Sequence, residues 1–271
     1  MMYDDVAHGH ALQNKLRGHL YNRPDGASSA APDVYAAVKD HIDYRKGQVS
    51  PANFLKVLTG DASAPGRVLK SGPNDDVFVY FADHGGMGIL AFPNLVDVIP
   101  RTLSADHLHA ALAKMKAKHM FRRLTFYTEA CESGSMFDGL LDPSLGIYVV
   151  TAANPKESSW GWYCDHSTEG GNVQGKWLGV CLGDEFSVKW MENTDAADEA
   201  KVSLAEQYTA VRYHLVVSGM YLSRCDARGV PHLAWGEAAG GDARVSRHSP
   251  PCLGYCIYGA GVCGIAVNTA V

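Results

Sequence analysis

The amino-acid sequence predicts an α/β fold with a mostly parallel central sheet. Three short runs, residues 77–82, 124–128 and 147–152, carry no charge and are rich in β-branched and aromatic side chains. Strands that are buried on both faces have this composition. The segment between the first two runs has helical spacing of its apolar residues, and strand, helix and strand in this order form a parallel unit.

Helices are predicted where a capping residue precedes a periodic segment. Residues 50–58 begin with serine followed by proline, which favours the first helical position. Residues 104–119 begin with a serine cap, and their apolar positions recur at helical spacing. Two further helical stretches are expected at 185–192 and 195–213.

Length and composition exclude several classes of protein. The 271 residues suffice for one large α/β domain or two small ones, and 46% hydrophobic with 20% charged residues is ordinary for a globular protein. A formal charge of −5 with scattered Lys and Arg argues against binding nucleic acid. The first residues, MMYDDVAHGH, do not read as a signal peptide. Seven cysteines, an odd number, would leave a free thiol in an oxidising compartment.

Two of the predicted strands end on chemically reactive residues. The first run stops at Asp83, His84 and Gly85, and the second stops just before Cys131. Because carboxyl ends of parallel strands meet at one edge of a sheet, we expect these side chains to lie together. Cys131 follows His84 by 47 residues, close to the offset of about 50 seen in caspases.

These residue types fit nucleophilic catalysis. A cysteine attacks as its thiolate, and a neighbouring imidazole stabilises the thiolate and later protonates the leaving amine. Gly85 lets backbone N–H groups approach a substrate carbonyl, so with the amide of Cys131 it would form an oxyanion hole. Taken singly, a cysteine after a strand is more often inert packing and a loop histidine more often solvated. Because the two residues follow adjacent strand ends, a catalytic pair and two ordinary structural residues are both possible interpretations.

Two acidic residues are candidates for a binding pocket beside this pair. Glu129 precedes Cys131 by two positions, so in a strand both side chains point to the same side. Asp184 lies where another segment enters a helix. The alternative for both is a surface or helix-capping carboxylate.

Several segments in residues 1–213 carry a family resemblance. They read MMYDDVA, VYAAVKDHIDYRKGQVSPANFLKVLTGD, VLKSGPNDDVFVYFADHGGMGILAFPN, FYTEACESGSMF, TAANPKESSW and CLGDEFSVKWMENTD. With them the chain resembles the legumains, the asparaginyl endopeptidases or vacuolar processing enzymes of the caspase-like cysteine peptidases. EACESGSM and the CLGD segment are specific to this family, and EACESGSM separates it from the related GPI transamidases.

The resemblance implies a caspase-like three-layer αβα fold and hydrolysis after asparagine, more weakly after aspartate at acid pH. His84 would be the general base and acid, Cys131 the nucleophile, and Gly85 with Cys131 the oxyanion donors. Glu129, Ser158 and Asp184 would line the S1 pocket, which reads the asparagine amide. No cofactor or metal is implied. The expected form is a vacuolar or lysosomal monomer that acts on peptides and proteins, with no clear membrane anchor.

The sequence also departs from the family pattern. MMYDD corresponds to the second core strand, so the N-terminal strand and helix are expected to be missing, with the family's catalytic asparagine and the Arg-His part of S1. Thr59-Gly60-Asp61 stands where members often have Arg-Gly-Asp. The predicted division is a peptidase domain over 1–213 and a non-homologous, disordered or aberrant tail over 214–271.

Alternatives remain for the tail and for the function. Residues 253–271 would make at most a weak membrane anchor, and Cys252 and Cys256 lack standard zinc spacing. Cys164 and Cys181 could form a loop disulfide.

A second function is possible for the chain as a whole. A catalytically impaired fragment would act at most as a binding protein. A transamidase would need a transmembrane C-terminus and partner subunits, and the Asp184 segment argues against it. An amine could also replace water, which would give peptide ligation.

Overall fold

A four-stranded sheet forms the centre of the computed structural model, with the strand order β11-β1-β5-β6. The structure describes residues 1–3, 7–8, 14–26, 28–93, 101–164, 172–197, 202–217 and 262–269. The strands are β1 (Asp75–Ala82), β5 (Arg123–Glu129), β6 (Ile147–Thr151) and β11 (Val262–Thr269). β1, β5 and β6 are parallel, as predicted, and β11 is antiparallel to β1.

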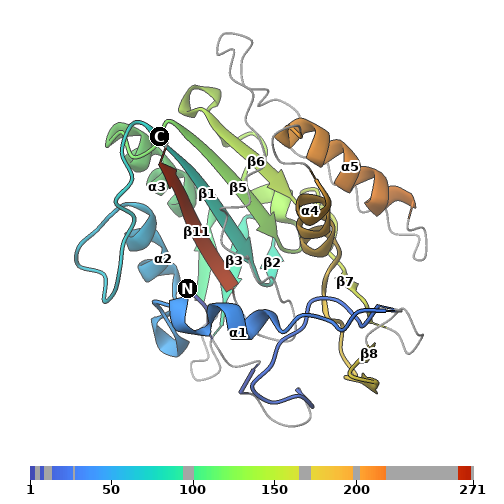
Figure 1. Ribbon diagram of the computed structural model, residues 1–271. Helices are drawn as coiled ribbons and strands as arrows, with labels where there is room; N and C mark the ends of the chain where they lie inside the picture. Colours follow the sequence, from blue (N-terminus) through green and yellow to red (C-terminus); the bar gives the residue numbers. More distant parts are fainter. Residues whose placement is uncertain are drawn as a thin grey trace.

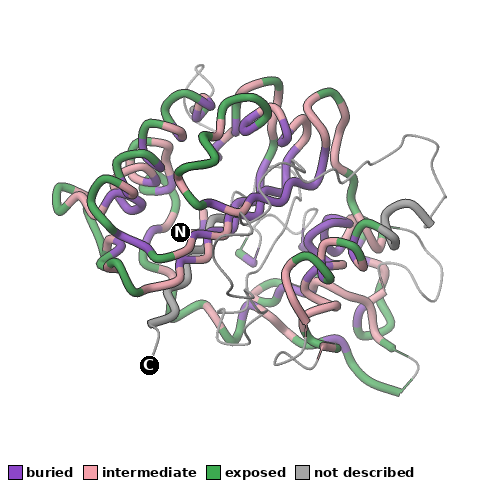
Figure 2. The backbone as a smooth tube through the Cα atoms, turned by 90° about the horizontal axis from the view of Figure 1, so that it is seen from above, coloured by how far each residue is buried: buried purple, intermediate pink, exposed green. Residues whose placement is uncertain are grey.

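Helices cover both faces of this sheet (Figure 1). One face carries α2 (Pro51–Leu58) and α3 (Ala105–Ala117), and the other carries α4 (Glu185–Ala196) and α5 (Leu204–Val217). The resulting three layers agree with the predicted αβα fold. In Figure 2 the buried stretches lie in the interior of the molecule and the exposed ones on its outside.

Both faces of strand β1 are buried, as its uninterrupted apolar run predicts. Its side chains alternate between two cores, so that each face of the strand is buried. Val77, Val79 and Phe81 join the core under α2 and α3. Tyr80 and Ala82 join the core under α4 and α5.

The helix starts confirm the predicted caps. The hydroxyl of Ser50 accepts a hydrogen bond from the backbone N–H of Asn53, with proline in the first turn. The hydroxyl of Ser104 accepts from the backbone N–H of His107. Each serine thus satisfies one of the N–H groups that a helix leaves without an intrahelical partner.

The last helix begins later than the sequence indicated. The expected stretch 195–213 is divided, because α4 continues to Ala196 and α5 starts at Leu204. A capping box marks the true start. Glu206 accepts hydrogen bonds from the N–H and hydroxyl of Ser203, each at 2.8 Å, and the N–H of Glu206 donates back to the Ser203 hydroxyl.

Small sheets and ribbons surround the carboxyl end of the central sheet. β2 (Gly85–Gly86), β3 (Ile89–Phe92) and β4 (Arg101–Ser104) form a three-stranded antiparallel sheet that begins directly after His84. The other ribbons pair β7 (Gly161–Trp162) with β10 (Gly183–Asp184), and β8 (Asn172–Val173) with β9 (Lys176–Trp177). None of these short strands was predicted.

The tail contributes a strand that the sequence analysis did not predict. β11 pairs with β1 along its whole length, from Asp75 opposite Thr269 to Ala82 opposite Val262. β1 therefore has hydrogen-bonded neighbours on both sides. The segment 253–271, considered above as an anchor, lies outside the described residues except for β11. Cys252 and Cys256 lie outside them too. No helix in the described parts of the chain has the length and hydropathy of a membrane span.

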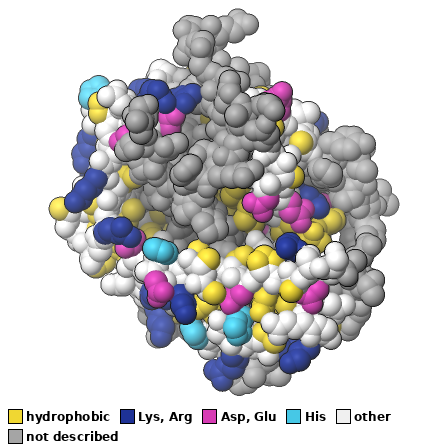
Figure 3. All heavy atoms as spheres, viewed as in Figure 1, with side chains coloured by type: hydrophobic (Ala, Val, Ile, Leu, Met, Phe, Trp, Pro, Cys, Tyr) yellow, Lys and Arg dark blue, Asp and Glu magenta, His cyan; other side chains and the backbone are white. Residues whose placement is uncertain are grey.

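Basic side chains do not gather in one place on the visible face. Figure 3 shows Lys and Arg at several separate positions, with acidic side chains among them. The Lys and Arg residues are scattered in the same way along the sequence.

Candidate active site

The ends of β1 and β5 bring the two reactive segments together. Ala82, the last residue of β1, stands opposite Glu129, the last residue of β5. The backbone N–H of Asp83 continues the pairing by donating to the carbonyl of Glu129 over 3.2 Å. His84 follows at the surface, and its own N–H donates to Oδ1 of Asp83 at 2.6 Å. The two strand ends are therefore neighbours, as their sequence order predicted.

Gly85 lies directly against the backbone of the candidate nucleophile. A Cβ atom at this position would stand 2.3 Å from the carbonyl oxygen of Cys131 and 2.8 Å from Cβ of Ala130. Real Cβ atoms essentially never come that close, so only glycine allows this approach. The peptide that follows His84 thus packs on the peptide of Cys131.

Cys131 is a free, partly exposed thiol at the start of a sharp turn. Its Sγ lies 3.9 Å from the carbonyl oxygen of Ser159. The next residue, Glu132, has a left-handed backbone with φ of 48°, and the short helix Ser133–Met136 follows. The N–H of Glu132 donates to the carbonyl of Glu157 at 2.8 Å, which holds this turn against the segment after β6.

Two carboxyl groups are buried beside the cysteine. Glu129 is fully buried, and its Oε2 accepts from both the N–H and the hydroxyl of Ser187, each at 2.8 Å. Burial raises the pKa of Glu129 well above its ordinary value, and the neighbouring Asp184 raises it further. The hydrogen bonds from Ser187 lower it only in part. Glu129 therefore keeps its proton to a higher pH than a surface glutamate does.

Asp184 lies directly before α4, but its side chain does not cap the helix. It is the cap residue of that helix, yet its side chain makes no capping hydrogen bond. It is buried and pairs with Gly161 across the β7–β10 ribbon. The alternative of a helix-capping carboxylate is therefore wrong for Asp184, and that of a surface carboxylate is wrong for both acids.

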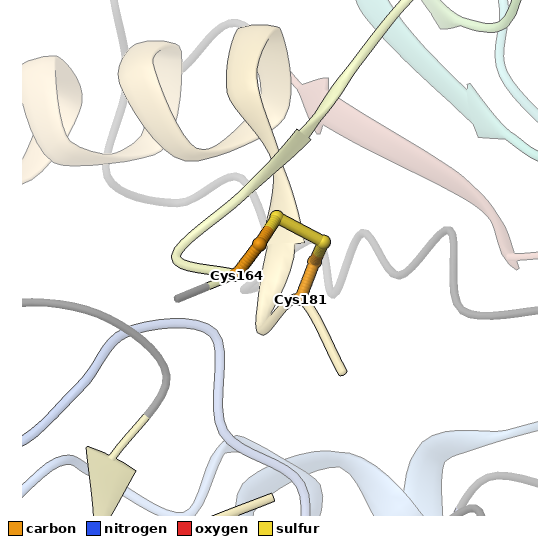
Figure 4. Close-up of a disulfide and its surroundings, with 2 residues drawn as sticks. All are labelled: Cys164 and Cys181. Carbon is orange, nitrogen blue, oxygen red and sulfur yellow. A yellow bond between two sulfur atoms is a disulfide. The ribbon is translucent and has the colours of Figure 1, made fainter. Parts of the chain in front are cut away.

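A disulfide closes the ribbon that carries Asp184. Cys164 and Cys181, the pair suggested by the sequence, are bonded to each other (Figure 4). The bond joins the segment after β7 to the segment before β10. Sγ of Cys181 lies 2.7 Å from where a Cβ of Gly161 would stand, so the disulfide packs on the residue that pairs with Asp184.

Ser158 lies half-buried in the segment between β6 and β7, one residue before the carbonyl that Cys131 faces. Ser187, Tyr80 and Ser135 were not predicted from the sequence. Ser187 donates to Glu129, Tyr80 contacts Ser187, and Ser135 contacts Gly88 and Glu132. Ser187 is the third residue of α4 and follows Asp184 by three positions. The sequence offered one sign of this role, which is a polar residue in the first turn of a predicted helix.

Comparison with known proteins decides the family. A sequence profile of the peptidase C13 family matches residues 1–228. This chain belongs to the peptidase C13 family. Members of the C13 family are expected to have a caspase-like fold. The mixed helix and strand architecture with a mostly parallel central sheet is consistent with that fold.

Individual relatives of this C13 chain are similar over most of its length. It is 43% identical over 215 residues to the vacuolar-processing enzyme delta-isozyme of Arabidopsis thaliana, covering 78% of this chain and 42% of that protein. It is 43% identical over 219 residues to legumain from Mus musculus and from Homo sapiens, covering 79% of this chain and 44% and 45% of those proteins. The chain thus spans less than half the length of these curated relatives.

Proposed function

We propose that this chain is a cysteine endopeptidase that cleaves peptide bonds after asparagine, and more weakly after aspartate. The observation that carries the proposal is the contact of the Gly85 peptide with the carbonyl of Cys131, which sets the histidine segment against the cysteine segment. Membership in the C13 family and similarity to proteins named legumain support the same activity.

In the proposed reaction, the thiolate of Cys131 attacks the carbonyl carbon of the peptide bond. The N–H groups of Gly85 and Cys131 donate to the oxyanion that forms. His84, as imidazolium, gives its proton to the leaving amine when the C–N bond breaks, and a thioester remains. His84 then takes a proton from water, the hydroxide attacks the thioester, and the cysteine is released.

Selection of asparagine is assigned to Glu129, Ser158 and Asp184. An asparagine side chain offers two N–H donors and one oxygen acceptor. A carboxylate accepts from the N–H groups, and a protonated carboxyl group can donate to the oxygen. Because burial and Asp184 raise the pKa of Glu129, this carboxyl group keeps its proton to a higher pH than a surface glutamate and can act as that donor. Aspartate would then be accepted best when it is itself protonated, at low pH.

The proposed place of action is a vacuole or lysosome. Relatives named vacuolar-processing enzyme and legumain support this, and the Cys164–Cys181 disulfide fits a compartment that does not reduce disulfides. We place the peptidase domain at 1–213, followed by a tail over 214–271 that completes α5 and adds β11 to the central sheet. We further propose that the chain acts as a monomer on peptide and protein substrates.

Hydrolysis of a fluorogenic Ala-Ala-Asn peptide at about pH 5.5 tests the activity. We expect cleavage by the purified chain, and none by Cys131→Ala or His84→Ala. The matching Ala-Ala-Gln peptide controls for the fit of the side chain, and we expect it to be cleaved far more slowly. If the Asn peptide is not cleaved, or is cleaved equally by Cys131→Ala, the peptidase proposal is wrong.

A further inference from the structure

One hydroxyl group joins the turn after Cys131 to the hairpin after His84. Oγ of Ser135 accepts a hydrogen bond from the backbone N–H of Gly88 at 2.8 Å. The same oxygen lies 2.6 Å from the carbonyl of Glu132 and 3.5 Å from that of Gly86. A serine hydroxyl has a single proton, so the short contact identifies the Glu132 carbonyl as its acceptor.

On the cysteine side, the Ser135 hydroxyl bonds to the carbonyl of Glu132, a residue with an unusual backbone conformation. Glu132 follows the nucleophile and has a left-handed backbone, which a residue with a side chain adopts only when its surroundings impose it. Its N–H is fixed by the carbonyl of Glu157, and its carbonyl accepts from both the N–H and the hydroxyl of Ser135. The direction of the Cys131 peptide depends on these bonds.

On the histidine side, the bond reaches the tip of the β2–β3 hairpin. Gly88 is in this turn, with φ of +70°, and β2 begins one residue after His84. Gly88 also fixes the start of α3, because its carbonyl accepts from the N–H of Ala105. A shift of Gly88 relative to Glu132 would therefore move the histidine segment relative to the cysteine.

We propose that Ser135 is a positioning residue that sets the distance between His84 and Cys131. The inference rests on the proposed function, since it concerns the same catalytic pair. The sheet register aligns the two strand ends, but His84 and Cys131 both lie beyond the strands. Among the side-chain hydrogen bonds in the described parts of the chain, that of Ser135 spans these two segments directly.

Ser133 provides a matched control in the same short helix. Its hydroxyl accepts from the N–H of Ala153 at 3.2 Å and lies 3.4 Å from the carbonyl of the same residue. These bonds tie the helix to the segment after β6 and not to the histidine hairpin. Ser133→Ala should therefore weaken the helix without changing the placement of His84.

The test compares Ser135→Ala, Ser135→Thr, Ser133→Ala and His84→Ala with the unaltered chain. Three quantities are measured: kcat and KM on the Asn peptide, thermal stability, and the rate at which iodoacetamide alkylates Cys131, followed by mass spectrometry. Alkylation requires a thiolate, so a nearby imidazolium speeds it in mildly acidic solution. The ratio of alkylation rates at about pH 6 and about pH 9 reports on the Cys131–His84 pairing without needing peptide cleavage.

We expect Ser135→Ala to lower kcat by roughly tenfold to a hundredfold with little change in KM, since small displacements of catalytic groups have such effects. Its alkylation ratio should fall towards that of His84→Ala. Ser135→Thr retains a hydroxyl and should recover much of both. Ser133→Ala should lose stability and keep the alkylation ratio of the unaltered chain.

An unchanged alkylation ratio in Ser135→Ala would overturn the positioning role. The positioning role would also be overturned if Ser135→Ala lost no more kcat than Ser133→Ala at equal loss of stability. A different result bears on the proposed function itself: if His84→Ala alkylates at the same ratio as the unaltered chain, Cys131 and His84 do not act as a pair, and both proposals fail.

Discussion

The hydroxyl of Ser187 donates to the buried carboxyl group of Glu129 over 2.8 Å and lies 2.6 Å from the hydroxyl of Tyr80. The three groups come from α4, β5 and β1, so the contact joins a helix to the two strands that precede the candidate catalytic residues. The backbone N–H of Ser187 adds a second bond to the same carboxyl oxygen. These two bonds hold the Glu129 carboxyl group in one orientation.

Replacing Ser187 by alanine should destabilise the protein and weaken substrate binding. The change leaves Glu129 and Tyr80, both fully buried, with one fewer hydrogen-bond partner each. A buried polar group that loses its partner costs about 1–3 kcal/mol, so the free energy of unfolding in urea should fall by about that amount. KM for the Asn peptide should rise. Tyr80→Phe removes only the far end of the chain of hydroxyls, and a KM change as large as that of Ser187→Ala would contradict this account.

The contribution of Glu129 to stability should decrease as the pH rises through the raised pKa of its carboxyl group. Burial and the charge of Asp184 raise the pKa of Glu129 in the folded state above its value in the unfolded chain. Below the unfolded pKa both states are protonated and the full stability is present. Above it the unfolded chain releases its proton first, so unfolding becomes easier until the pH passes the folded pKa.

Urea unfolding at a series of pH values measures this dependence. The Glu129 contribution to the slope, taken as the difference between the unaltered chain and Glu129→Gln, should approach about 1 kcal/mol per pH unit at its steepest. Asp184→Asn should move the Glu129 contribution to lower pH by removing the like charge. Glu206→Gln is the control, because the exposed Glu206 has a lowered pKa from its bonds to Ser203 and contributes in the opposite direction. If the pH dependence of Glu129→Gln equals that of the unaltered chain, Glu129 makes no such contribution.

The central fold could be predicted because its signals are local. Strand β1 contains the unbroken apolar run 77–82, whose two faces pack in different cores, and α2 and α3 begin at serine caps. The start of α5 was missed because residues 195–203 contain no proline or glycine to interrupt a helical pattern, although the Ser203–Glu206 capping box was readable. Strand β11 could not be predicted, since its partner β1 is far away in the sequence and its pairing is not local.

The candidate site could be predicted only in part for a related reason. His84 and Cys131 are recognisable because they follow strand ends that a parallel sheet brings to one edge. The hydroxyl groups of Ser135 and Ser187 are not, because serines are common in turns and first helical turns. Their partners, Gly88 and Glu129, become visible only when hairpin, helix and sheet are packed together.

Replacing Gly85 by alanine should remove most of the activity while the protein stays folded. The new Cβ would stand 2.3 Å from the carbonyl oxygen of Cys131, a backbone atom that cannot rotate away. The hairpin must then move, and a displacement of about 1 Å at a catalytic group can lower kcat/KM about a hundredfold.

Gly86→Ala is the matched control for this change. Its Cβ would meet Cγ1 of Ile89 at 3.3 Å, and that flexible, exposed side chain can turn aside. We expect Gly86→Ala to lose far less of kcat/KM on the Asn peptide, with circular dichroism confirming that both variants are folded. Equal losses in the two variants would show that the contact between Gly85 and Cys131 has no particular role.

Removing the disulfide should affect stability and substrate selection together. Cys164 and Cys181 are 17 residues apart, and closing a loop of this length stabilises a protein by about 3 kcal/mol. The bond also packs on Gly161, which pairs with Asp184, so loosening the ribbon displaces a wall of the proposed pocket. Cys164→Ser/Cys181→Ser should therefore lower the free energy of unfolding by about that amount and raise KM for the Asn peptide more than it lowers kcat.

The disulfide itself is checked by alkylating the denatured chain before and after reduction. Peptides containing Cys164 and Cys181 should be labelled only after reduction, whereas Cys131 should be labelled in both samples. Cys164→Ser alone would leave Cys181 as a free thiol, so the double variant is the cleaner comparison. If KM is unchanged in the double variant although its stability falls, the ribbon keeps Asp184 in place through the β7–β10 pairing alone.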